Sequence, residues 1–180
     1  MALTCPDSSK SNLTKSEELL LVSVLEWYNQ SGEEKVSQFL QLVEPRKNNK
    51  GLSLRVIDWL VTNYSRKTPI IIEKGGTPKD LYKDYHLYLS AYNKRYMDPF
   101  ARKKRVTVVA FGKMRRRTST TIGQLVFFKW FIENNIRFYL EQNKTKVEED
   151  MKKCITRKVK DKKPRQRTCS FSGSFKVTFS

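Results

Sequence analysis

The sequence predicts an α+β fold: a helix-dominated single domain of about five helices, with a small sheet of short strands and basic extended termini. Three observations predict it. Apolar residues recur at spacings of three and four over most of the chain. A β-branched run at residues 106–111 is typical of a strand, and positive charge gathers in two segments. The 180 residues suit one domain, and 3 Trp, 8 Tyr and 10 Phe are enough to build a core.

Capping and periodicity signals place the first three helices. Thr14 and Glu17 have the spacing of a capping box, so a helix is expected over residues 14–30. Apolar positions three and four apart predict a second helix over residues 33–44 and a third over residues 52–65.

A short strand and a fourth helix are expected next. Residues 69–73 look like a strand, and the glycine pair at 75–76 is a turn that lacks the spacing of a phosphate-binding P-loop. Thr77 is a good N-cap and Pro78 suits the first helical position. The fourth helix should therefore start there and end before Asp98.

The most apolar stretch predicts a core helix that starts after Thr121, which has capping-box spacing with Gln124. Its remaining polar stripe consists of Lys129, Glu133, Arg137 and Glu141. These charges alternate in sign four residues apart, so neighbours can pair along one face. A helix this apolar is typical of a domain core, and a partner-binding helix is the alternative. The charged stripe argues against a membrane span, which needs about 20 mostly apolar residues.

Composition divides the chain into a flexible N-terminal arm (1–13), a globular core (14–151), a basic linker (152–168) and a C-terminal strand (169–180). In the last segment apolar and polar residues alternate, which is the pattern of a half-buried strand. We expect this strand to pair with residues 106–111 or with a sheet edge of another copy of the protein. Its candidate partner-contacting residues are Phe171, Phe175, Val177 and Phe179.

The net charge of +18 lies almost entirely in two segments. Residues 94–117 contain ten basic residues and one acid, for +9, and residues 152–167 contain nine basic residues and one acid, for +8. Charge this localised attracts a polyanion or an acidic protein face, whereas dispersed charge would serve solubility better. The candidate binding residues are Arg102, Lys103, Lys104, Arg105, Arg115, Arg116, Arg117, Lys152, Lys153, Arg157, Lys158, Lys160, Lys162, Lys163, Arg165 and Arg167.

The sequence contains no readable catalytic, cofactor-binding or metal-binding motif. Its three cysteines form no C-x-x-C pair. The single histidine, His86, has no accompanying histidine or cysteine and is expected at the surface or the edge of the core. Asp58 and Asp98 are the acids hardest to dismiss, although Asp98 before Pro99 is expected to cap a turn. No cofactor, small-molecule substrate or catalysis is predicted, and a pocket with acids converging on Asp58 or Asp98 would contradict this.

Three blocks within residues 52–151 carry a resemblance to a known family. They are WLVTNYS at 59–65, YLSAYNKRYMDPF at 88–100 with Arg102, and TTIGQ at 120–124 with its continuation through 128–135. Together they resemble a small protein encoded by nucleocytoplasmic large DNA viruses, such as the iridovirus, marseillevirus and mimivirus groups. The resemblance implies a viral protein, packaged in the particle, from a family without an assigned activity. It supplies no catalytic residues.

Two non-enzymatic functions remain, and the first is slightly preferred. The first is a minor capsid or cement component of the virion, which bridges capsid-shell proteins through basic loops and extended termini. The second is a sequence-nonspecific nucleic-acid-binding protein of the virion core or nucleus, whose basic segments contact phosphates. The expected partners are other virion proteins or nucleic acid. Without a signal-peptide pattern or a transmembrane segment, we expect the protein in the host cytoplasm or nucleus during assembly and then in the virion.

Overall fold

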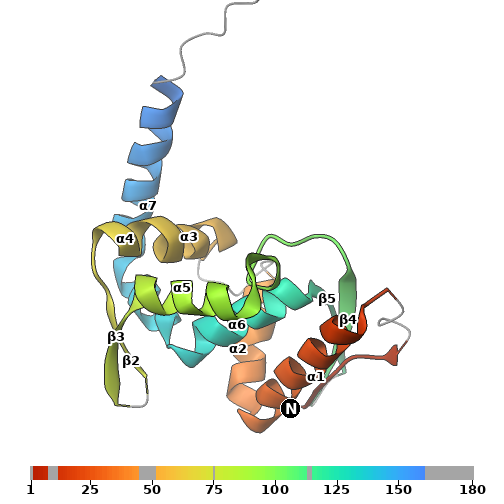
Figure 1. The fold of residues 1–180 in the computed structure, drawn as a ribbon. Helices are drawn as coiled ribbons and strands as arrows, with labels where there is room; N and C mark the ends of the chain where they lie inside the picture. Colours follow the sequence, from red (N-terminus) through yellow and green to blue (C-terminus); the bar gives the residue numbers. More distant parts are fainter. Residues whose placement is uncertain (1, 8–11, 45–51, 75, 113–114, 161–180) are drawn as a thin grey trace, which may run out of the picture.

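The computed structural model describes residues 2–7, 12–44, 52–74, 76–112 and 115–160. These residues form a helix-dominated α+β domain with two small antiparallel sheets, which confirms the predicted fold class (Figure 1). In chain order the elements are β1 (Ala2–Thr4), α1 (Lys15–Gln30), α2 (Glu33–Val43), α3 (Leu54–Trp59), η2 (Leu60–Tyr64), α4 (Ser65–Lys67), β2 (Ile71–Lys74), β3 (Thr77–Asp80), α5 (Leu81–Tyr92), η3 (Lys94–Tyr96), β4 (Arg105–Phe111), β5 (Arg116–Thr121), α6 (Ile122–Glu133) and α7 (Ile136–Lys160).

Helix α1 begins at the predicted capping box. The Thr14 hydroxyl accepts from the Glu17 backbone N–H at 3.3 Å, and the Glu17 carboxylate accepts from the Thr14 N–H at 2.9 Å. The capping box therefore satisfies two backbone donors at once. Helix α2 follows after Gly32, whose φ of 92° lies in the region that favours glycine.

The predicted third helix is a continuous helical run with a π-helical middle. Segment η2 carries the π-type turns between α3 and α4. Two hydroxyls bond back to carbonyls one turn earlier: Thr62 donates to Asp58 at 2.7 Å, and Ser65 donates to Val61 at 2.7 Å. Such wider turns are often found at functional sites, and the carbonyl of Asp58 takes part in one of these bonds.

The prediction of a helix cap at Thr77 is wrong. Thr77 and Pro78 belong to β3, where they pair with Lys74 and Glu73 in a two-stranded hairpin. Gly76, with φ of 77°, supplies the turn, and Pro78 is tolerated because a two-stranded sheet consists of edges only. The cap is Asp80, whose carboxylate accepts from the Lys83 backbone N–H at 2.9 Å.

The second sheet has the strand order β1-β4-β5, with β4 in the centre. Strand β4 confirms the predicted strand at residues 106–111, but β1 and β5 were not predicted. The expectation of a flexible N-terminal arm is wrong for Ala2–Thr4, since Leu3 is fully buried and pairs with Ala110. The Asn29 side chain accepts from the Leu3 N–H at 2.6 Å and donates to the Leu3 carbonyl at 3.1 Å, which satisfies the other edge of β1.

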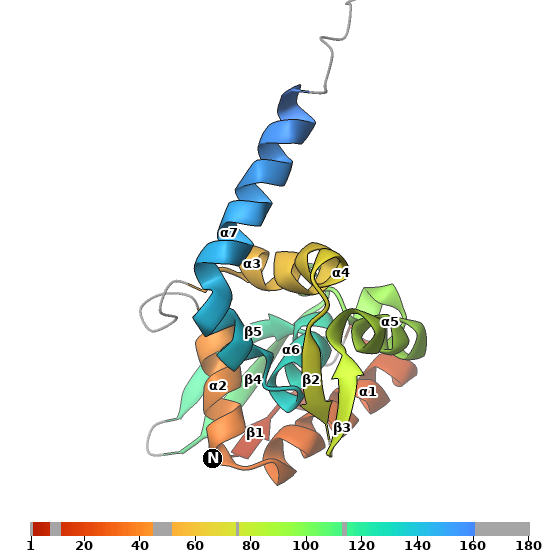
Figure 2. The same ribbon diagram turned by 90° about the vertical axis from the view of Figure 1, so that its left-hand side faces the viewer.

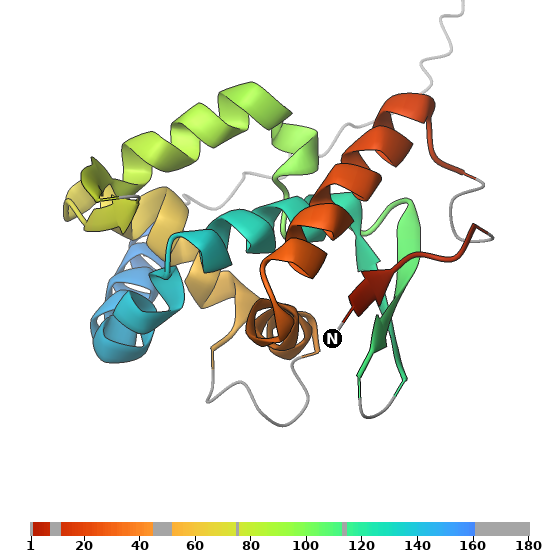
Figure 3. The ribbon, with the colours of Figure 1, turned by 90° about the horizontal axis from the view of Figure 1, so that it is seen from below.

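Helix α6 is the core of the domain, as predicted. Figure 3 shows it running between α5 on one side and α1 with α2 on the other. Phe127, Phe128, Trp130 and Phe131 are at most 1% exposed. The buried indole of Trp130 donates to the Asp84 carboxylate at 2.8 Å, so the one polar atom of this ring is satisfied inside the core.

Helices α6 and α7 meet at a sharp break. Asn135 has a φ of 49°, the left-handed region, so the helical period does not run straight through the asparagine pair. The predicted polar stripe is therefore interrupted: Arg137 pairs with Glu141 at 2.9 Å on α7, whereas Glu133 at the end of α6 accepts from the Tyr88 hydroxyl at 3.2 Å.

Helix α7 continues through Lys160, so the prediction of a linker at residues 152–168 is wrong for its first part. Asp150 ties the helix to the body, because its carboxylate accepts from Lys67 at 2.8 Å and from the Trp59 indole at 2.9 Å. Lys67 also donates to the Cys154 sulfur at 3.1 Å, and beyond that residue the helix projects away from the domain (Figures 1 and 2). Among the described residues, none of the helices has the length and apolarity that crossing a bilayer requires.

The predicted C-terminal strand at residues 169–180 lies outside the described residues. Its proposed pairing along all of residues 106–111 conflicts with the observed sheet. Strand β4 is bonded to β5 on one side, and its positions 109–111 are bonded to β1 on the other.

Candidate functional site

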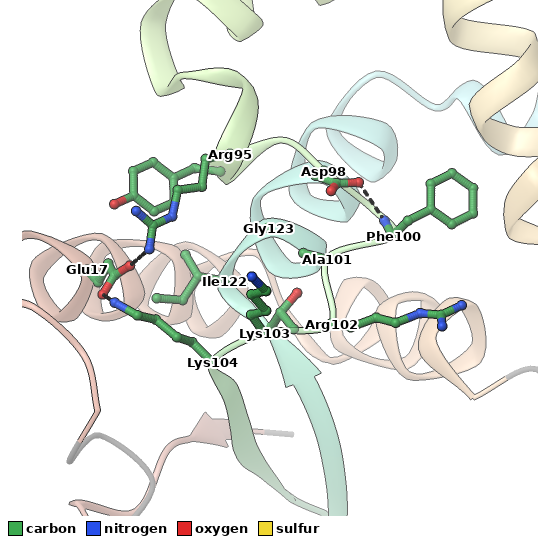
Figure 4. A pocket seen from close by; sticks show the side chains of 12 residues that line it. Glu17, Arg95, Asp98, Phe100, Ala101, Arg102, Lys103, Lys104, Ile122 and Gly123 are labelled. Atoms are coloured by element: carbon green, nitrogen blue, oxygen red, sulfur yellow. Dashed lines mark hydrogen bonds and ion pairs between the residues drawn. The ribbon is translucent and has the colours of Figure 1, made fainter. Parts of the chain in front are cut away.

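A cavity of about 620 Å³ lies where the loop after α5 crosses the start of α6. Its charged lining residues are Glu17, Arg95, Asp98, Arg102, Lys103 and Lys104. We call it the basic cavity. Figure 4 shows these side chains arriving from α1, from η3 and from the loop that leads into β4, around Ile122 and Gly123 of α6. The volume falls in the range of roughly 300–1,000 Å³ that is usual for ligand sites.

The loop is held against α6 by close backbone contacts. A Cβ atom on Gly123 would lie 2.8 Å from the Asp98 carbonyl oxygen, so only glycine permits this approach. Gln124 does not complete the predicted capping box. Its backbone N–H donates to the Thr121 hydroxyl at 3.2 Å, but its side-chain amide donates to the Pro99 carbonyl at 3.0 Å.

Asp98 caps the turn that it was predicted to cap. Its carboxylate accepts from the Phe100 backbone N–H at 2.8 Å (Figure 4). The side chain of Phe100 is 40% exposed. Two hydrogen bonds therefore hold the Asp98-Pro99-Phe100 turn, one from the Phe100 N–H to Asp98 within the turn and one from the Gln124 side chain of α6 to the Pro99 carbonyl.

Glu17 forms ion pairs with two of the four cations of the basic cavity. Its carboxylate is almost fully buried and accepts from Lys104 at 2.6 Å and from Arg95 at 3.0 Å. Burial by itself would raise the pKa of Glu17, but the hydrogen bonds from Lys104 and Thr14 outweigh it and lower the pKa below its ordinary value. Within the described part of the chain, Arg102 and Lys103 form no ion pair, and both are exposed.

The predicted basic residues do not form one surface. Arg105 lies opposite Thr121 and Arg116 lies opposite Ala110, so the runs 102–105 and 115–117 sit at opposite ends of the β4–β5 hairpin. Arg116 is paired with Glu44, which also accepts from the Thr118 hydroxyl at 2.5 Å. The run 115–117 is therefore partly neutralised by the chain's own carboxylate.

The other predicted binding residues lie on or beyond α7. Lys152 and Lys153 are exposed on this helix. Arg157, Lys158 and Lys160 belong to its last turns, but their side chains lie outside the described atoms. Lys162, Lys163, Arg165 and Arg167, and the strand residues Phe171, Phe175, Val177 and Phe179, lie outside the described residues.

A second cavity, of about 390 Å³, was not predicted. Its polar and aromatic lining residues are Asp58, Thr62, Tyr82, Tyr85, His86, Lys94 and Asp98. We call it the aromatic cavity. Asp58 and Asp98, from segments 40 residues apart in the sequence, thus converge on one hollow, and this is the arrangement that would contradict a protein without catalysis. Paired acids in a pocket are what general acid–base catalysis needs, so the absence of catalysis stays a prediction.

The two aspartates influence each other and their neighbours. Partial burial raises the pKa of Asp58, the negative charge of Asp98 raises it further, and Arg55 opposes both effects. Burial, followed by the charges of the two aspartates, raises the pKa of Tyr85 to about 12. His86 is exposed, as predicted, and its ring meets that of Tyr82 edge-on with the ring centroids 4.4 Å apart.

The two cavities share a wall. Residues 94–100 contribute to both: Arg95 and Tyr96 line the basic cavity, Lys94 and Met97 line the aromatic cavity, and Asp98 lines both. Sequence reasoning found the basic loop and the two aspartates, but it missed Glu17, Arg95 and Tyr82 as site residues. Among the described residues, no group of three or more histidine, cysteine or acidic side chains could hold a metal ion.

Comparisons with known proteins place the chain in a family. Residues 8–176 match a family of unknown function, DUF7197, and the chain belongs to it. The chain is similar to uncharacterized protein L507 of Acanthamoeba polyphaga mimivirus, with 36% identity over 152 residues. The match covers 81% of this chain and 58% of the mimivirus protein, so the chain spans little more than half of that relative's length. The resemblance to proteins of large DNA viruses is thereby confirmed. No solved structure matches the chain.

Proposed function

We propose that this viral protein binds nucleic acid mainly through the backbone phosphates, which are held in the basic cavity. The observation that supports this most is the gathering of four cations around one hollow at the start of α6. Arg95, Arg102, Lys103 and Lys104 face Glu17 and Asp98, which leaves a net charge of +2 around the cavity. The proposal reverses the slight preference for a capsid component, because three of the predicted cations, Arg102, Lys103 and Lys104, line a cavity.

The arrangement suits an anion that is fixed in place. Buried Glu17 holds Arg95 and Lys104 by charge-assisted hydrogen bonds. These two side chains are therefore already ordered in the free protein, which lowers the entropy cost of binding a ligand. Arg102 and Lys103 remain at the rim. Partial positive charge at the N-terminus of α6 adds to the attraction for a phosphate.

The test is fluorescence anisotropy with a random-sequence oligonucleotide between about 50 and 200 mM salt, where a protein with several phosphate contacts loses affinity steeply. The Arg102→Ala/Lys103→Ala double variant should bind more weakly, and the slope of log K against log salt should fall by about 2. The matched control is Lys79→Ala/Lys83→Ala, which removes the same charge at exposed positions away from the basic cavity. Equal losses in the two double variants, or no binding by wild type at about 50 mM salt, would contradict the proposal.

The second candidate is a minor capsid or cement protein of the virion, and the projecting end of α7 favours it. Ile155 on this helix is 40% exposed, beside exposed Lys152 and Lys153. An apolar side chain ringed by cations suits an acidic neighbour in the shell. Deleting residues 171–180 should abolish incorporation into particles and leave nucleic-acid affinity nearly unchanged. Unaltered incorporation would count against assembly through the C-terminal strand, and recovery of the protein with the genome instead of the shell would favour the first proposal.

A further inference from the structure

We infer that the aromatic cavity receives an unpaired base of a single-stranded nucleic acid whose backbone lies in the basic cavity. The inference rests on the proposed function and specifies its ligand. It needs three features of the structure: the adjacency of the cavities, the rings of the aromatic cavity and the two carboxylates on its wall.

Adjacency comes from the shared wall at residues 94–100. One short segment of backbone separates the two hollows, and Asp98 lines both. In a nucleotide only the sugar separates the phosphate from the base. A nucleic-acid strand that places a phosphate beside Arg95 can therefore direct the attached base across residues 94–100 toward Tyr82.

The rings supply a stacking surface. Tyr82 is half-buried and His86 is exposed, with their rings in edge contact 4.4 Å apart, and Tyr85 closes the floor. Bases of single strands bind proteins by stacking on such rings, and this contact tolerates any base because every base has a π face. In a duplex the bases are already stacked and paired, so the cavity would distinguish single strands from double strands.

The carboxylates decide which part of the nucleic acid enters. The carboxylate oxygens of Asp58 and Asp98 accept hydrogen bonds, so they suit a ligand with N–H donors better than a phosphate, which offers none. Bases do offer donors: cytosine presents an N4 amino group, and adenine presents an N6 amino group. The aromatic cavity is therefore matched to a base with an exocyclic amine, and thymine, which lacks one, is the poorest fit.

An organic cation, such as the side chain of a basic peptide, is the competing ligand for two carboxylates among aromatic rings. The basic cavity across the wall argues against it, because four cations stand within one backbone segment of the site, and Lys94 lines the aromatic cavity itself. The experiment separates the two ligands directly.

The experiment measures anisotropy at one fixed salt concentration for fluorescein-labelled dC and dT 12-mers and for a duplex of the same length. Wild type should bind the dC strand more tightly than the dT strand, and either strand more tightly than the duplex. Tyr82→Ala should weaken binding of the single strands about tenfold and leave duplex binding unchanged, since one stacking contact is worth about that factor. Tyr82→Phe keeps the ring and should keep the affinity, and His86→Ala tests a second ring at an exposed position where folding is not at risk.

Asp58→Asn should reduce the preference for dC over dT. Equal binding of single strands and duplex by wild type would overturn the inference while leaving the basic cavity as the binding site. So would affinity losses in Tyr82→Ala and His86→Ala that are the same for single strands as for the duplex. Loss of all binding in wild type would instead overturn the proposed function. Arginine amide in excess is the cation probe. If it displaces the dC strand from wild type but not from Asp58→Asn, the aromatic cavity is a cation site and the inference is wrong.

Discussion

Glu17 takes part in two structures that the sequence presents as unrelated. As the third helical residue of α1 it completes a capping box, which local spacing predicts. As a buried carboxylate it also holds Arg95 and Lys104, which are 78 and 87 residues away. No local pattern predicts those two ion pairs, because they exist only once the loop after α5 crosses α1.

Replacing Glu17 with Gln should lower the free energy of unfolding by about 1–3 kcal/mol at pH 7, because two cations lose their charged partner at a buried site. The pKa of Glu17 is lowered in the folded state. Its contribution to stability is therefore fully present above the ordinary carboxyl pKa and is lost as the pH falls through the folded value. Urea denaturation at pH 7 and pH 3 checks this. The difference between wild type and Glu17→Gln should shrink at pH 3.

Glu26→Gln is the matched control for this prediction. Glu26 is exposed on the same helix, and its replacement should stay within about 0.5 kcal/mol at both pH values. A difference between wild type and Glu17→Gln that is independent of pH would show that Glu17 acts through packing alone.

Gly123→Ala should destabilise the protein by about 1–3 kcal/mol, a cost typical of overpacking. The added Cβ meets the Asp98 carbonyl oxygen at 2.8 Å, and backbone on both sides prevents an easy escape. Because the wall must move, oligonucleotide affinity should fall as well. Ser23→Ala, at an exposed position within α1, provides the control in urea denaturation. Wild-type stability and affinity in Gly123→Ala would mean that the loop can shift freely.

At the scale of elements, apart from the cap wrongly placed at Thr77, the predictions succeeded where a local signal marks an end and failed where an element depends on distant partners. Helices α1, α2 and α6 follow from their caps and periodicity. Strand β5, with the sequence RRTSTT, contains no apolar residue, yet Thr118, Thr120 and Thr121 are buried because β4 lies beside it. Strand β1 has three residues, too few for any period to appear.

The candidate site was predictable to a similar degree. The basic run at residues 102–105 and the aspartates Asp58 and Asp98 could be identified from residue type. Their distribution over two cavities with one wall could not, since it depends on how tightly the loop packs against Gly123. A glycine at the second position of an apolar helix was the one available signal, because glycine within a helix is costly unless a close approach requires it.

The break between α6 and α7 depends on the left-handed conformation of Asn135. Asn135→Ala should lower the free energy of unfolding by about 1–2 kcal/mol, because an L-residue with a Cβ and no local polar group is disfavoured there. Asn135→Gly is the matched variant and should be neutral or slightly stabilising. Urea denaturation of the pair checks this. Equal stability of the Ala and Gly variants would show that the turn adjusts without strain.

For the whole molecule, the uneven charge makes the affinity for a polyanion depend on whether the polyanion is long enough to contact both basic regions. Helix α7 has 25 residues, which corresponds to a length of about 38 Å, and the body contacts it as far as Cys154. The basic cavity and the cations near the tip of α7 are thus separate contact regions, which a long polyanion can join and a short one cannot.

Ending the chain after Thr156 keeps the buried Val147 and the Asp150 contacts but removes eight basic residues and one acid. Thermal stability should change little. Affinity for a 40-mer should fall and its salt slope should decrease by several units, whereas affinity for a 12-mer should stay nearly constant. Anisotropy titrations at several salt concentrations measure both. Equal losses for the two lengths would indicate that the basic cavity and the end of α7 act on the same few phosphates.

The wall at residues 94–100 also ties the two hollows together thermodynamically. If a ligand in one cavity shifts this segment, the affinity of the other cavity for its ligand changes. Linkage then requires that the second ligand change the affinity for the first by the same factor. Inorganic phosphate and a free base, added as separate small molecules, would then each change the measured affinity for the other. Any cooperativity between them would measure how stiff the backbone is between Lys94 and Phe100.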